Sequence, residues 1–230
     1  IDDSNWDSAV QVAGEPVPLV SGTPQGMTVS GLQPATTYYF AMKVVDAAAN
    51  ESALSNVDDG TTQAIVNVAL GKTVTSNGTP ASGTFLANVT DGNTNRDNYA
   101  LISVADGPKW VQVDLGQAYG IERLNIRNDW GSQPDRYRTG KDHIVQLSND
   151  PDFLTGVTTV FNNDADNSAG LGAGTDAEYQ EPTDGSGKTI DLTTPVQARY
   201  VRFWANGHVR VNSEVHLVNT PVEIEAYVAE

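Results

Sequence analysis

The stretch Trp110-Val111-Gln112-Val113-Asp114-Leu115 decides the fold class of this 230-residue sequence. Apolar and polar side chains alternate strictly along it, which is the period of a strand with one face in a core. Clusters of Gly, Pro, Asn or Asp bound it and the similar runs, and no amphipathic helix of three turns is found. The sequence therefore predicts an all-β fold built of sandwiches. The other runs are Thr37–Val45, Leu124–Arg127, His143–Leu147, Arg199–Trp204 and Val222–Tyr227.

The composition excludes several classes of protein. There are 29 acidic and 13 basic side chains, a net charge of −16. This argues against a nucleic-acid binder, which needs a basic face, and equally against attraction to anionic lipid. No apolar run is long enough to cross a bilayer, and Ile1 to Ser8 lack the regions of a secretion signal, so any signal is expected upstream or already removed. The absence of Cys excludes disulfides and thiolate sites, and 3 His exclude a His-rich metal centre.

A change in composition near Asp58 to Gln63 predicts two domains, residues 1–64 and 65–230. The first carries 8 acids and 1 base, whereas the second carries 21 acids and 12 bases. No long Ser/Gly stretch separates them, so we expect a tight junction and not a flexible tether.

The first domain contains Gly31-Leu32-Gln33-Pro34-Ala35-Thr36-Thr37-Tyr38-Tyr39-Phe40, followed by the run from Val45 to Asn56. These residues resemble the second half of a fibronectin type III domain. The resemblance implies a corner at Tyr38, whose hydroxyl ties back to the preceding loop. About three of the seven strands of such a sandwich are missing, so we expect upstream strands from the same protein or from another chain to complete it. A spacer role is favoured over adhesion.

The second domain resembles the discoidin, or coagulation-factor C-type, domain, a group that includes carbohydrate-binding module family 32 and the fucose-binding lectins. The resemblance implies a jelly-roll (galactose-binding-like) β-sandwich with loops gathered at one end, and most bacterial members bind sugars. Its landmarks, in order, are Asn67–Val74, Asp91–Asn93, Lys109–Gly116, Ile121–Ile126, Val145–Asp150, Ala198–Phe203 and Val222–Tyr227.

The loop Asn88-Val89-Thr90-Asp91-Gly92-Asn93 has the carboxylate, the turn glycine and the short polar neighbours that suit calcium. In the resembling family the equivalent loop holds a structural calcium. Carried across, the resemblance implies the Asp91 and Glu223 carboxylates and the carbonyls of Asn88, Asn93 and Val222 as ligands. A further family ligand falls near Arg96, which could serve only through its carbonyl. The alternative is an ordinary Asp-Gly turn and an unrelated surface Glu.

A second acidic loop, Asn162 to Ser168, places Asp164, Asp166 and Ser168 at alternate positions, as in an EF-hand. Ala169 stands where that loop needs Gly, and Thr175 stands where it needs the bidentate Glu. The EF-hand interpretation therefore fails, and a solvated loop is predicted.

The loop from Asn128 to Arg138 combines aromatic rings with guanidinium groups, and this combination suits a sugar. A ring can stack on the apolar face of the sugar while Arg donates to its hydroxyls. In the alternative, the rings pack under the loop and the arginines pair with Asp129 and Asp135. His208 and Arg210 in a later loop, and Tyr99 after Asp91, are weaker candidates. The candidate sugar-binding residues are thus Tyr99, Trp130, Arg136, Tyr137, Arg138, His208 and Arg210.

No catalytic motif is present: there is no Gly-x-Ser-x-Gly, no His-Glu-x-x-His and no phosphate-binding Gly loop. We therefore expect a non-catalytic carbohydrate-binding fragment of a larger, secreted bacterial polysaccharide-active protein. Calcium is its expected structural cofactor and a glycan its expected partner. The alternative is a structural or adhesive spacer without a sugar site.

Overall fold

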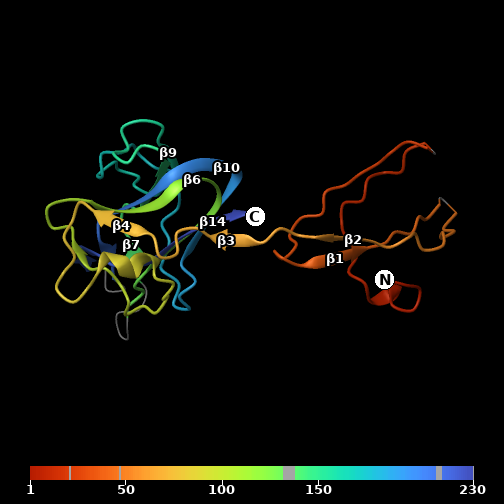
Figure 1. The fold of residues 1–230 in the computed structure, drawn as a ribbon, viewed down its shortest axis with the longest axis horizontal. Coiled ribbons are helices and arrows are strands. Elements are labelled where there is room, and N and C mark those ends of the chain that lie inside the picture. Colours follow the sequence, from red (N-terminus) through yellow and green to blue (C-terminus); the bar gives the residue numbers. More distant parts are fainter. Residues whose placement is uncertain (21, 47, 132–137, 211–213, 230) are drawn as a thin grey trace. The chain divides into compact units, whose positions relative to one another are not determined.

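The computed structural model describes residues 1–20, 22–46, 48–131, 138–210 and 214–229. Its contacts divide the chain into two compact units, residues 1–65 and 66–229. Within the described residues, the regular structure consists of strands and two short 3₁₀ helices (Figure 1), which confirms the predicted all-β class. None of the helices in this part of the chain has the length and apolar character of a membrane span.

The first unit contains little regular structure. The helix η1 covers Trp6–Ser8, and the strands β1 (Thr37–Phe40) and β2 (Asp58–Thr61) form an antiparallel pair. The predicted run Thr37–Val45 is thus a strand only as far as Phe40, and Val45 beyond it makes an isolated bridge to Glu51. The expected corner contact is present, because the Gln33 N–H donates to the Tyr38 hydroxyl at 2.8 Å.

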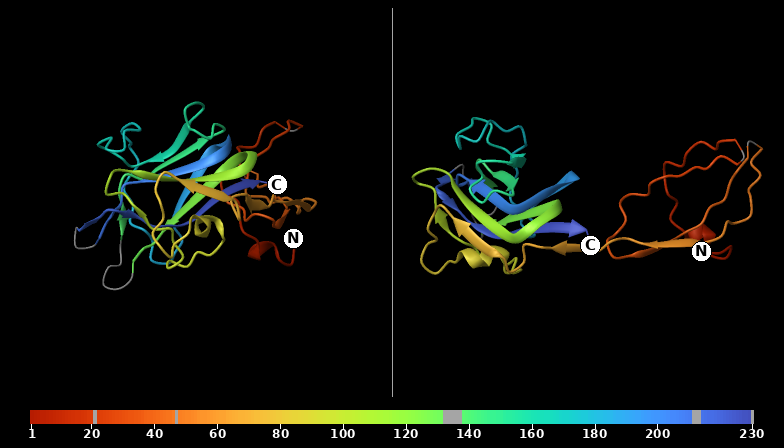
Figure 2. Two further views of the ribbon diagram at one scale, coloured as in Figure 1. Left: turned by 60° about the vertical axis from the view of Figure 1, so that its left-hand side comes forward. Right: turned by 45° about the horizontal axis from the view of Figure 1, so that its top comes forward.

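The second unit is built on a seven-stranded sheet in the order β3-β14-β6-β10-β8-β9, with β4 paired to β6. Figure 2 shows β6 and β10 as its longest, curved ribbons. Two small sheets, β12-β11-β7 and β13-β5, and the helix η2 (Leu86–Thr90) complete the unit. The strand bounds are β3 Ile65–Asn67, β4 Thr73–Ser76, β5 Ile102–Ser103, β6 Lys109–Asn128, β7 Thr139–Gly140, β8 Ile144–Ser148, β9 Thr158–Asn162, β10 Lys188–Ala205, β11 His208–Val209, β12 Val215–His216, β13 Val218–Asn219 and β14 Pro221–Ala229.

Strand β6 joins two segments that the sequence predicts as separate strands, Trp110–Leu115 and Leu124–Arg127. The chain bends there instead of ending the strand: Gly116 adopts a φ of +89°, and the pairing with β10 shifts register between Asp191 and Val196. Such irregularities bend a strand without terminating it. One half of β6 therefore pairs with β4, and the other half pairs with β14.

The alternation along β6 and β10 produces the core. Val111, Val113 and Leu115 on β6, with Val201 and Phe203 on β10, point to one side and are almost completely buried. Residues on the other face are polar or amphipathic. The candidate sites described next lie in the loop after η2, in the loop after β6, and on the strands β11 and β14.

Candidate functional site

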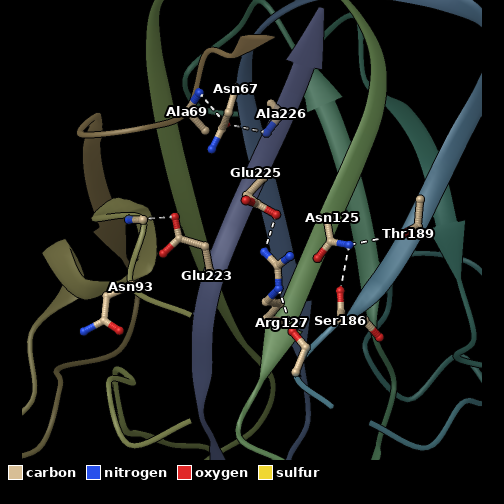
Figure 3. Close-up of polar contacts among 12 residues, drawn as sticks. Asn67, Ala69, Asn93, Asn125, Arg127, Ser186, Thr189, Glu223, Glu225 and Ala226 are labelled. Atoms are coloured by element: carbon tan, nitrogen blue, oxygen red, sulfur yellow. Dashed lines mark hydrogen bonds and ion pairs between the residues drawn. The ribbon is translucent and has the colours of Figure 1, made fainter. Parts of the chain in front are cut away.

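The predicted metal loop lies against the last strand of the sheet. Helix η2 ends at Thr90, Asp91 follows, and Gly92 turns the chain with a φ of +79°. The Gly92 N–H donates to Oε1 of Glu223 at 3.2 Å, across 131 positions of sequence. Figure 3 shows Glu223 extending from β14 toward the loop that carries Asn93. The two carboxylates named by the resemblance, Asp91 and Glu223, are thus brought to one place.

Glu223 is a buried acid that lacks a full set of partners. Its side chain is 0% exposed, and its Oε2 atom has no hydrogen-bond partner among the described residues. Burial raises the pKa of Glu223 to about 7, and the nearby Asp91 and Glu225 carboxylates act in the same direction. The Gly92 N–H and Arg127 oppose that rise. An ionised carboxylate is unfavourable when it is buried without enough positive or hydrogen-bonding partners. A bound cation near Glu223 would offset that cost.

The other predicted ligands occupy different positions around this pair. Asn93 donates its N–H to Oδ1 of Asp91 at 2.8 Å and is exposed. Asn88 is half-buried in η2, and Val222 is fully buried beside Glu223 on β14. The Arg96 side chain turns elsewhere, because its Nη1 atom donates to the Gly131 carbonyl at 2.6 Å.

The predicted sugar residues Arg138 and His208 line one small polar cavity with room for about one water molecule. Arg138 pairs through Nη1 with Asp129, as the alternative interpretation of this loop expects. Two side-chain nitrogens, Arg138 Nε and His208 Nε2, are buried and have no hydrogen-bond partner in the described part of the chain. The remaining wall residues are Asn128, Asp129, Gly140, His143, Glu181, Ala205, Gly207, Val218, Asn219 and Thr220.

His208 lies on β11 and not in the predicted loop, and it is only 5% exposed. Its Nδ1 atom lies 3.2 Å from the Val218 carbonyl, and its ring stacks on that of His216 at 5.4 Å. A carbonyl oxygen only accepts, so we assign the proton to Nδ1 and a lone pair to Nε2. Burial lowers the pKa of His208 to about 4, and the positive charge of Arg138 acts in the same direction.

The sequence reasoning missed two further residues of this cavity, His143 and Glu181. Burial lowers the pKa of His143 to about 3, and burial raises the pKa of Glu181 to about 7. The Asn128 N–H donates to Glu181 at 2.9 Å. Gly140 is required here, since a Cβ at that position would overlap the His143 ring. Glu181 lies in an irregular segment without periodicity, and no local pattern marks it.

The remaining sugar-binding candidates are not in the wall of this cavity or lie outside the described residues. Trp130 is half-buried and packs on Gly185, whose added Cβ would lie 3.0 Å from the indole Cη2 atom. Tyr99 is half-buried in the loop after the metal loop. Arg210 is half-buried, and its N–H donates to the Glu214 carbonyl at 2.9 Å. Arg136 and Tyr137 lie outside the described residues.

A group of three acids could hold a metal ion, and it includes none of the predicted ligands. Carboxylate oxygens of Asp142, Asp164 and Asp166 lie within 4.8 Å of one another. Much of this arrangement is explained by internal hydrogen bonds: Ser168 Oγ donates to Asp142 at 2.7 Å, and the Ser168 and Ala169 N–H groups donate to Asp164. The acidic loop folds around Asp164, which is fully buried, while residues 165–168 are exposed, so the predicted solvated loop holds for its tip and not for Asp164.

Comparison with known proteins gives one family. Residues 88–203, half of the chain, match the model of a family described as "NedA-like, galactose-binding domain". No curated protein matches the chain.

Solved structures with a related shape include three bacterial modules. Chitosan-binding module 1 of a chitosanase/glucanase from Paenibacillus sp. IK-5 is 22% identical; the match covers 71% of this chain and 99% of that one, with a TM-score of 0.47. A fucose-binding module of Streptococcus pneumoniae is 16% identical, with coverage of 72% and 99% and a TM-score of 0.48. CpGH89CBM32-4 of Clostridium perfringens, in complex with GlcNAc-α-1,4-galactose, is 16% identical, with coverage of 71% and 94% and a TM-score of 0.48.

Proposed function

Because the chain belongs to the family of NedA-like, galactose-binding domains of the F5/F8 C type, we propose that its second unit binds carbohydrate without catalysing a reaction. One observation carries this proposal: the cavity wall contains a buried donor, Arg138 Nε, and a buried acceptor, His208 Nε2, both without partners among the described residues. A sugar hydroxyl both donates and accepts, so it can satisfy both atoms at once. Burying such atoms unpaired would be unfavourable.

The size of the cavity sets the mode of recognition. A space for about one water molecule accepts one hydroxyl group and not a whole ring. The rest of the sugar then lies outside the cavity, where Trp130, next to the wall residue Asp129, offers an aromatic surface. A contact of this extent supports weak binding, with a dissociation constant of about 10 μM to 1 mM.

Two conservative variants test the site. Arg138→Lys keeps a positive charge opposite Asp129 but removes the Nε donor, and His208→Gln removes the imidazole acceptor. We expect each to weaken the binding of galactose, or of the best ligand on a glycan array, by about 10-fold or more in calorimetric titration. Arg123→Lys, at an arginine that pairs with Asp191 on the sheet, is the matched control.

The results separate the proposal from its alternative. If both variants bind like the parent while the protein retains glycan affinity, the cavity is not the site. If no glycan on the array binds at millimolar concentration, the spacer interpretation of the sequence replaces carbohydrate binding.

We also propose that a calcium ion binds between the metal loop and β14. The support is the buried Oε2 atom of Glu223, which has no partner among the described residues and belongs to the same site as the Asp91 carboxylate. Asp91, Glu223 and the carbonyls of Asn88, Asn93 and Val222 would hold the ion, with the Arg96 carbonyl as a further ligand. Calcium prefers such oxygen donors, and it would supply the charge that the two acids need.

Calcium removal gives a direct measurement. A ligand present at a thousand times its dissociation constant stabilises the folded state by about 4 kcal/mol. Chelation should therefore lower the melting temperature of the second unit, and Glu223→Gln should abolish that difference. Glu178→Gln, at an exposed glutamate, is the control. An unchanged melting temperature on chelation of the parent would show that the site holds no calcium.

For the first unit, we propose a partial fibronectin type III domain that acts as a spacer. The contact of the Tyr38 hydroxyl with the Gln33 N–H supports this assignment. So do the exposed large apolar side chains near the β1–β2 pair, which strands from elsewhere in the same protein or from another chain would cover. The setting we propose is a larger, secreted bacterial protein that acts on polysaccharide, in which the second unit holds the substrate.

A further inference from the structure

Arg96 connects the metal loop to the loop that forms the cavity wall. It belongs to the segment after Asp91, yet its Nη1 atom donates to the carbonyl of Gly131, 35 positions further along the chain, at 2.6 Å. Its Nε atom lies 3.7 Å from Asp97 Oδ1 within its own loop. One side chain therefore spans two loops that have separate proposed functions.

The end of this connection at the metal site depends on Asp91. The Asp91 carboxylate accepts from the Asn93 N–H at 2.8 Å and from the Asn98 side-chain amide at 3.1 Å. The same Asn98 amide also donates to the Asn93 carbonyl at 3.2 Å. These bonds close the segment that contains Arg96 into a loop anchored at Asp91. The position of Asp91 thus fixes the point from which Arg96 extends.

The other end of the connection leads to the cavity. The Gly131 N–H donates to Oδ1 of Asp129 at 2.7 Å, and the second oxygen of Asp129 pairs with Arg138. Gly131 is therefore held on both sides, by Arg96 at its carbonyl and by Asp129 at its N–H. Asp129 and Arg138 both line the cavity.

A second link between the same two regions passes through Gly185. A Cβ added to Gly185 would lie 3.0 Å from Trp130 Cη2 and 3.9 Å from the carbonyl oxygen of Thr94. The glycine backbone thus packs between the indole and the metal loop. Gly131 thus contacts the segment that the cation would order directly through Arg96, and Trp130 is linked to it through Gly185.

We propose that Arg96 is a positioning residue that couples cation binding to carbohydrate binding. A divalent cation at Asp91 and Glu223 fixes the 91–98 loop, and Arg96 transfers this order through the Gly131 carbonyl to Asp129 and Arg138. The inference rests on both proposed functions of the second unit. Because coupling between sites is reciprocal, calcium strengthens sugar binding by the same factor as sugar strengthens calcium binding.

The experiment uses the full chain and two separate readouts. The first is hydrogen exchange of the Gly131 amide with calcium and with chelator, followed by NMR, which needs no sugar. The second is the affinity for galactose under the same two conditions. In the parent, we expect calcium to slow exchange of this amide and to tighten galactose binding by about 5-fold or more.

The decisive variant is Arg96→Met, which keeps the chain length and the backbone carbonyl but removes the guanidinium donor. At a calcium concentration that saturates the variant, as its own calorimetric titration shows, both calcium effects on Gly131 and on galactose should be lost. Arg123→Met should behave like the parent, because this arginine pairs with Asp191 on the sheet.

The outcomes identify which proposal fails. If calcium protects the Gly131 amide equally in the parent and in Arg96→Met, the coupling role of Arg96 is wrong. If calcium does not bind the parent, the cation proposal fails and the coupling fails with it. If galactose does not bind, carbohydrate binding fails for this sugar, and the exchange of the Gly131 amide alone still supports or overturns the role of Arg96.

Discussion

Both units contain strands that the sequence predicts, but the two units have very different cores. Every residue that the structure describes as buried lies at Ala69 or beyond, so the first unit contributes none. Its apolar side chains are instead in solvent: Val10 is 93% exposed, Val20 is 83% exposed and Met42 is 63% exposed. The second unit closes its sheet over a continuous cluster on β6, β10 and their neighbours.

This difference shows that alternation predicts strands but does not guarantee a core. Phe40 ends β1 and is 37% exposed, whereas Phe203 lies on β10, is 2% exposed and packs on the His143 ring at 4.9 Å. Both residues follow the two-residue period. A strand becomes stable when other elements cover its apolar face, and in the described residues of the first unit the only sheet is the β1–β2 pair.

Separating the two units tests this difference with the largest expected effect. Residues 1–64 expressed alone should show no cooperative unfolding, because a two-stranded pair without a covered face is marginal in water. Residues 65–230 should unfold cooperatively. Urea titrations followed by circular dichroism measure both. A cooperative, monomeric transition in the first piece would contradict the proposed partial sandwich.

A matched pair of core mutations tests the same contrast within the intact chain. Phe203→Ala should destabilise the second unit by about 3–5 kcal/mol, since it leaves a cavity in a packed core. Phe40→Ala should cost less, about 1 kcal/mol or below, since Phe40 is 37% exposed and none of the described residues of the first unit is buried. Chemical denaturation of the two variants gives both values. Equal costs would mean that the first unit has a core that we have not recognised.

The pH dependence of the free energy of unfolding gives a smaller effect that is specific to the second unit, because all three histidines lie there. His208 has a native pKa of about 4, well below the ordinary 6.5. Between pH 6.5 and 4 the unfolded chain therefore binds a proton that the native state does not. The free energy of unfolding then falls as the pH falls, by about 1.4 kcal/mol per pH unit for this residue.

The measurement compares the parent with His208→Gln in urea at pH 7.5, 5.5 and 4.5. The stability of the parent relative to the variant should decline as the pH is lowered. Glu181→Gln is the control of opposite sign: the native pKa of Glu181 is about 7, so the native state takes up the extra proton as the pH falls toward 4.5. Parallel curves for the parent and His208→Gln would contradict the buried neutral imidazole.

The sequence predicts the strands well because their periodicity is local. It does not predict the single long β6, since Gly116 resembles the end of a strand and only the pairing with β10 shows that the strand continues. Asp91 and Glu223 are far apart in the sequence, and no period connects them. Their proximity could be anticipated only from the family resemblance.

The rest of the site lacked a sequence signal for physical reasons. His143 stands at the edge of a predicted strand and could equally have been a solvated residue; its burial depends on the absence of a side chain at Gly140. The carboxylates of Asp142 and Asp164 lie close together, although 22 positions separate them in the sequence. The spacing of an EF-hand loop is too short to include both residues. Glu181 depends on Asn128 at the end of β6, a partner that no local pattern indicates.

The neighbouring positions of β3 and β14 have a consequence for the order of the chain. The Val68 N–H donates to the Ala226 carbonyl at 2.8 Å, so the segment that enters the second unit runs beside the segment that leaves it. A short peptide could join these two ends, and new ends could be opened in the surface loop at Leu154, which is 81% exposed. The second unit is therefore suited to circular permutation, in which the same sheet is built from a chain that begins at a different residue.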